Sequence, residues 1–150
     1  MRTANFRRQH DAALTVAGEL ARQIDRLGTQ PNQADAHALT MLLARLTGAL
    51  RIHLAQEDQL LYPQMIASPD PAISATARQF AAEMGGISAT FLDYAERWKR
   101  AGAIVAAPER FRTETKAIFA ALADRIEREN NVLYPLAERG AAQAAAGYAA

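Results

Sequence analysis

Apolar residues recur at intervals of three and four in four long segments of the chain. This spacing is typical of helices that bury one face, and no segment shows the period-two alternation of a half-buried strand. We expect helices over residues 5–27, 33–67, 72–101 and 108–139. Four such helices joined by short loops predict an all-α, up-down-up-down four-helix bundle built from two helical hairpins.

Glycine and proline mark the ends of the expected helices, and the segment 102–107 is expected to be a loop. Pro63 is expected to kink the second helix near its end, because proline lacks the backbone N–H that a helix uses. Gly140 is expected to end the fourth helix, so residues 1–140 would form the bundle and residues 141–150 an alanine-rich tail. Leu60 and Val132 are expected to point inward.

The second and fourth helices contain the same phrase. Residues 53–63 read HLAQEDQLLYP and residues 125–135 read RIERENNVLYP, so Glu57 aligns with Glu129 at a constant offset of 72 residues. The repeat predicts two related hairpins. The copies differ at their first residue, which is His53 in one and Arg125 in the other.

The repeated phrase places ionisable residues on apolar helix faces. His53 and Glu57 are four residues apart, so they share one face, which is otherwise leucine. A buried carboxylate is costly unless it is paired, protonated or bound to a metal, and Glu129 doubles the cost. A cation bound between the two carboxylates would remove this energetic cost, and His53 and the inward His10 could supply nitrogen ligands to it.

Other interpretations of these residues remain open. A single core histidine is usually structural, and His-x-x-x-Glu pairs are common on solvated helices. Arg125 could form a buried salt bridge with Glu57 or Glu129. The repetition of the motif on the apolar face, together with a second inward histidine, favours a metal site.

This pattern resembles the hemerythrin-like (HHE cation-binding) family along essentially the whole chain. The resemblance implies a four-helix bundle that binds two irons through inward histidines and two bridging carboxylates. His10 and His53 match the histidine ligands of the first two helices, and Glu57 and Glu129 match the bridging carboxylates.

The chain departs from the family pattern at two positions. Met84 and Arg125 stand where the third and fourth helices should supply histidines, and every histidine lies within the first 53 residues. We interpret Met84 as core filler and His37 as a surface residue. The guanidinium of Arg125 is always charged and suits carboxylates, so it can replace a second ion.

Together these features predict a degenerate member of the family that holds one divalent ion, iron or alternatively zinc or manganese, through His10, His53, Glu57 and Glu129. A sensing or stress role is compatible with such a site, but a competent di-iron oxygen carrier is not expected. The alternative is a metal-free structural or interaction module in which Arg125 neutralises both glutamates.

A third interpretation is an enzyme such as an iron-dependent oxidase or peroxidase, in which Tyr62, Tyr94, Trp98 and Tyr134 could serve as redox side chains. Aromatic residues at helical spacing are far more often core, and no cysteine or serine tied to a base by a motif supports nucleophilic catalysis. These features favour binding over catalysis.

Composition and charge restrict the partners. The net charge of +1 gives no reason to expect a nucleic-acid or membrane partner. No apolar run resembles a signal peptide or approaches the about 18 residues of a spanning helix, so we expect a soluble cytoplasmic protein. A protein partner or a homodimer is left open.

Overall fold

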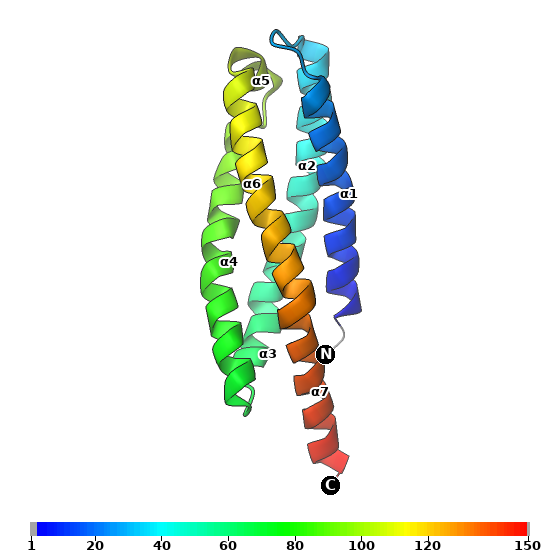
Figure 1. Cartoon of the computed structure of the whole chain (residues 1–150), viewed down its shortest axis with the longest axis vertical. Coiled ribbons are helices and arrows are strands. Elements are labelled where there is room, and N and C mark those ends of the chain that lie inside the picture. The colour runs from blue at the N-terminus through cyan, green and yellow to red at the C-terminus, as the bar shows by residue number, and fades with distance from the viewer. Residues whose placement is uncertain (1–2, 150) are drawn as a thin grey trace.

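The computed structural model describes residues 3–149, which form four helical rods running alternately up and down (Figure 1). The first rod is α1 (Ala4–Arg26) and the third is α4 (Pro71–Arg97). The second and fourth rods each have three parts: α2 (Gln33–Gln56), η1 (Glu57–Leu61) and α3 (Tyr62–Ile66), and α6 (Pro108–Arg128), η2 (Glu129–Leu133) and α7 (Tyr134–Ala149). The described residues contain no strand, and the predicted all-α bundle of two hairpins is confirmed.

Capping residues satisfy free backbone groups at the starts of the second and third rods. Asn32 and Asp70 accept hydrogen bonds from backbone N–H groups in the first turns of α2 and α4, at 2.7 and 2.9 Å. Pro71 and Pro108 stand at the starts of α4 and α6, where a missing N–H costs nothing. These local signals explain why the predicted helix starts agree with the structure to within about one residue.

Two expected breaks are wrong. The segment expected as a loop contains a short helix, α5 (Ala101–Ala106), which is held in place because Ile104 is fully buried in the core. The fourth rod continues through Gly140 to Ala149. One glycine inside a helix costs only about 1 kcal/mol, and a β-carbon at this position would lie 3.4 Å from Ile73 Cδ1, at the edge of ordinary van der Waals contact.

Both copies of the repeated phrase contain a turn of π-helix that begins at the glutamate. A π-turn holds one residue more than an α-turn, so the residues after it are rotated. Leu60 and Val132 are therefore 56% and 44% exposed, and the prediction that they point inward is wrong. The next residues, Leu61 and Leu133, are fully buried instead. Pro63 follows the first of these turns and falls within the first turn of α3.

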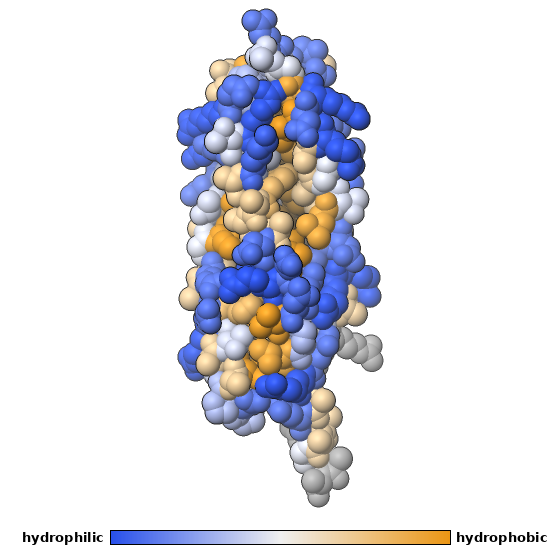
Figure 2. Space-filling view, viewed as in Figure 1, coloured by the Kyte–Doolittle hydropathy of each residue, from blue (hydrophilic) through white to orange (hydrophobic). Residues whose placement is uncertain are grey.

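The core has two apolar clusters with a polar layer between them. The larger cluster lies toward the α1–α2 loop and α5, and contains residues such as Leu20, Leu46, Phe91 and Phe111. The smaller lies toward the chain termini and includes Phe80. On the face drawn in Figure 2, a band of hydrophilic residues likewise separates two stretches of apolar surface. The buried ionisable residues occupy the layer between the clusters.

One helix in the described chain, Gln33–Ile66, is long and apolar enough to cross a membrane by length and composition alone. Its most apolar 18-residue window has a mean hydropathy of 1.2, so the expectation that no stretch would qualify is wrong. Within the bundle, 44% of that window is buried, and the core helix of a soluble protein passes the same test.

Candidate metal centre

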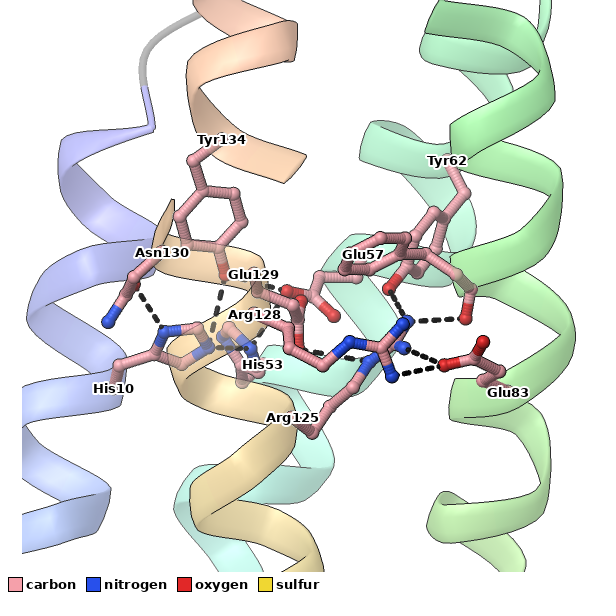
Figure 3. A network of polar contacts seen from close by, with 11 residues as sticks. His10, His53, Glu57, Tyr62, Glu83, Arg125, Arg128, Glu129, Asn130 and Tyr134 are labelled. Atoms are coloured by element: carbon pink, nitrogen blue, oxygen red, sulfur yellow. Dashed lines mark hydrogen bonds and ion pairs between the residues drawn. The ribbon is translucent and has the colours of Figure 1, made fainter. Parts of the chain in front are cut away.

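Four ionisable side chains from three of the rods meet in the polar layer (Figure 3). His10 comes from α1, His53 from α2, Glu57 from η1 and Glu129 from η2. All four are buried, and one ligand atom from each lies within 4.8 Å of the others. The structure thus brings together the residues that the sequence selected. His37 is exposed, as expected.

Hydrogen bonds fix which ring nitrogen of each histidine carries a proton. His10 Nδ1 lies 2.9 Å from Asn130 Oδ1, and His53 Nδ1 lies 2.8 Å from Gln9 Oε1. Amide oxygens only accept, so each Nδ1 donates. The amide of Gln9 is itself oriented by donating from Nε2 to Gln56 Oε1 at 2.9 Å. Histidines that bind metals are oriented by outer contacts of this kind.

The two Nε2 atoms consequently face each other without protons when the rings are neutral. They are 2.9 Å apart, a separation at which two lone pairs repel unless a proton or a cation lies between them. Burial lowers the pKa of His10 to about 4; the contact with Asn130 partly opposes this shift and the nearby His53 adds to it. His10 is therefore neutral at pH 7 and keeps its lone pair available.

The glutamates have more acceptor atoms than the surrounding residues can satisfy. Glu57 Oε1 lies 2.9 Å from His53 Nε2 and accepts a hydrogen bond of 2.7 Å from Tyr134 Oη. Within the described residues, Glu57 Oε2 and both oxygens of Glu129 have no hydrogen-bond partner. Leaving buried carboxylate oxygens without partners is costly, and a bound cation would remove that cost.

The two carboxyl groups also influence each other's protonation. Burial raises the pKa of Glu129 well above its ordinary value, and the neighbouring Glu57 adds to the increase. Burial alone would raise the pKa of Glu57 as well, but contacts with Glu129, His53 and Tyr134 favour its ionised form and lower its pKa below the ordinary value. Without a metal, the two carboxyl groups therefore share one proton at neutral pH.

Arg125 occupies the other side of the polar layer and is fully buried. Its Nη1 donates to Glu83 Oε2 at 3.0 Å, and its Nη2 donates to Tyr62 Oη at 3.1 Å and to the Phe80 carbonyl. The guanidinium also lies over the Phe80 ring, 4.3 Å from its centre. Its Nε is 3.7 Å from Glu129 Oε1. Of the two glutamates of the cluster, Arg125 thus pairs with Glu129.

The surroundings of Arg125 mirror those of His53. In the first hairpin the Phe6 ring meets His53 edge-on at 5.8 Å, and in the second Phe80 packs on Arg125. Met84, where the resemblance implies a histidine, is buried in the smaller apolar cluster. Arg125 therefore stands at the position equivalent to His53, with its own set of partners.

Sequence reasoning missed several residues of this network. Gln9 and Asn130 each adjoin a predicted ligand in the chain, and that adjacency is their only sequence signal. Glu83 adjoins Met84, the residue that replaces a histidine. Tyr62 and Tyr134 belong to the repeated phrase, where they read as core aromatics.

The donor set fits a cation of the first transition series. Imidazole nitrogen and carboxylate oxygen together suit iron(II), manganese and zinc. The facing Nε2 atoms and the three carboxylate oxygens without partners are the observations that support the fit.

Comparison with known proteins agrees with this donor set. Residues 1–137 match the family described as the Hemerythrin HHE cation binding domain. No curated protein and no solved structure matches the chain.

Proposed function

The chain belongs to the hemerythrin HHE cation-binding domain family, and we propose that it binds one divalent metal ion, with iron as the leading candidate. His10, His53, Glu57 and Glu129 would hold the ion. The observation that supports this most directly is the 2.9 Å approach of two imidazole Nε2 atoms beside buried carboxylate oxygens that lack partners.

We limit the proposal to one ion because of Arg125. A second ion beside Glu129 would face a guanidinium that stays charged at any physiological pH. Arg125 Nε is 3.7 Å from Glu129 Oε1, so the positive charge of a second ion is already supplied there. The protein is therefore not a two-iron oxygen carrier of the kind that the family resemblance implies.

A bound iron would supply Lewis acidity and one-electron redox chemistry. The residues of the chain would hold and orient it: Gln9 and Asn130 fix the two imidazoles. Two imidazoles and two carboxylates also leave coordination positions free on a six-coordinate ion. A free position accepts a small ligand, so a sensing or stress role is the physiological role we favour.

Elemental analysis of protein purified without added metal tests this proposal. We expect about one ion per chain, and an increase in melting temperature when iron(II) or zinc is added to the apoprotein. The Glu57→Gln variant should lose both the bound ion and this increase in melting temperature. His37→Ala is the matched control, because it removes an exposed histidine and should change neither result. Much less than one ion per chain, with no thermal shift on adding metal, would overturn the proposal.

A metal-free structural module is the second candidate. The observation that favours it is the ion pair between Arg125 and Glu129, which already offsets part of the buried negative charge. In that case one proton held by the carboxyl pair replaces the ion. The same elemental analysis decides between the candidates, because the module should be purified without metal.

A further inference from the structure

Tyr134 lies beside the proposed ion site, but its role there was not predicted from the sequence. Its ring is fully buried, and its hydroxyl oxygen is 2.7 Å from Glu57 Oε1 and 3.1 Å from His10 Nε2. His53 Nε2 is 2.9 Å from each of those two atoms. The four atoms form a closed ring, to which each of the four residues contributes one atom that could bind a metal (Figure 3).

The phenol proton alone does not satisfy this ring. The phenol donates that proton to Glu57. The Nδ1 atoms of both histidines are directed away, to Gln9 and Asn130. The two Nε2 atoms face each other inside the ring at 2.9 Å, and a cation between them would be bound by both nitrogens together with the two oxygens.

The ring is small enough for its four atoms to contact one cation. Donor atoms about 2.1 Å from a metal stand about 3.0 to 3.4 Å apart. The four edges measure 2.7, 3.1, 2.9 and 2.9 Å, so one ion could contact all four atoms.

Tyr62 is the equivalent residue in the first copy of the phrase, and it also meets a cation. Its hydroxyl oxygen accepts a hydrogen bond of 3.1 Å from Arg125 Nη2. Each tyrosine of the repeat thus directs its oxygen to the other hairpin. Tyr62 contacts the guanidinium of Arg125, and Tyr134 contacts Glu57 and His10.

We propose that Tyr134 is a direct ligand of the ion, through its phenolate oxygen, alongside His10, His53, Glu57 and Glu129. This inference rests on the proposed function. On binding, the phenol O–H bond breaks, an oxygen–metal bond forms and one proton is released to solvent, with no change in oxidation state. A phenolate is a hard anionic donor that binds ferric iron, as the tyrosine ligand of some haem proteins does.

Spectroscopy of the iron-loaded protein tests the inference. Apoprotein would be loaded with iron(II) under nitrogen and oxidised with ferricyanide, and bound iron would be measured by elemental analysis. We expect a phenolate-to-iron(III) charge-transfer band in the visible region, with tyrosine ring modes in the resonance Raman spectrum. Tyr134→Phe should lose the band and bind iron about tenfold or more weakly, whereas the matched control Tyr62→Phe should keep the band.

The outcomes separate this inference from the proposed function. Bound iron without the band in the natural protein, or a band unchanged in Tyr134→Phe, would overturn the inference and leave the proposed function standing. Absence of bound iron in the natural protein would overturn both. Circular dichroism checks that each phenylalanine variant retains the helical fold.

Discussion

At the scale of single residues, Arg125 shows how one change divides two equivalent half-sites. A buried guanidinium has to be paired, and here it is balanced by Glu83 and Glu129 and hydrogen-bonded to Tyr62. His53, its equivalent, instead lies beside a histidine and a glutamate that have no cation of their own. The equivalent position therefore holds a permanently charged guanidinium, Arg125, in the second hairpin. In the first hairpin it holds an imidazole, His53, that can bind a metal.

Replacing Arg125 by methionine should destabilise the apoprotein by about 3–5 kcal/mol, because it removes the guanidinium that offsets the negative charge of the buried carboxyl pair. The change is measured by urea denaturation in the presence of a chelator. Arg128→Met is the matched control: Arg128 also pairs with Glu83 and packs on Phe80, but its side chain is 38% exposed. An exposed pair contributes under about 1 kcal/mol, and equal losses in the two variants would contradict the prediction.

At the scale of elements, each π-turn places its glutamate and the tyrosine of the following Leu-Tyr-Pro on the same, inward side of the rod. In the first copy, Glu57, Leu61 and Tyr62 are all buried although they span more than one α-helical turn. The extra residue of the turn rotates Leu60 outward so that the glutamate and the tyrosine both face the interior. The second copy repeats this arrangement with Glu129 and Tyr134.

Inserting an alanine after Gln59, an exposed residue within η1, should remove this alignment. One residue of α-helix corresponds to about 100° of rotation, and the π-turn already accommodates one extra residue, so Glu57 and Tyr62 could no longer both face inward. We expect a loss of unfolding free energy of more than about 3 kcal/mol and loss of metal binding.

The matched control is insertion of an alanine after Thr29, which is exposed in the connection between α1 and α2. Lengthening that connection should cost much less, because surface loops tolerate changes in length. Thermal unfolding and elemental analysis of the two insertion variants give the comparison. Retained metal in the variant with the insertion after Gln59 would show that the register set by the π-turn is not needed for the site.

At the scale of the whole molecule, the polar layer joins rods that are otherwise held by the two apolar clusters. The predicted ligands come from three of the four rods, and two of them, Glu57 and Glu129, lie in different hairpins. An ion held there would cross-link the hairpins. Binding should therefore be linked to the stability of the complete fold.

Adding metal should raise the free energy of unfolding in proportion to the logarithm of its concentration. A ligand present at about 100 times its Kd stabilises a folded protein by about 2.7 kcal/mol. We expect this increase when iron(II) is titrated into the apoprotein, and its reversal by a chelator. The increase should be absent in Glu57→Gln; if that variant responds as the natural protein does, the metal acts elsewhere.

The sequence by itself determined the bundle, most of its helix ends and the four residues of the candidate centre. These follow from local chemistry: the apolar periodicity, the capping residues, and ionisable side chains on otherwise apolar faces. Helix breaks were predicted wrongly where tertiary packing prevailed over local preference. Ile104 is buried in the core and Gly140 packs on Ile73, so both segments remain helical.

Only the tertiary structure decided how the centre is completed. Glu83 and Tyr62 pair with Arg125, Gln9 and Asn130 orient the histidines, and Tyr134 closes the ring of donor atoms. Most of these contacts join rods whose relative rotation and height are set by packing and by the two π-turns. Periodicity indicates which face of a helix is buried, but not which residue on a facing helix lies opposite it.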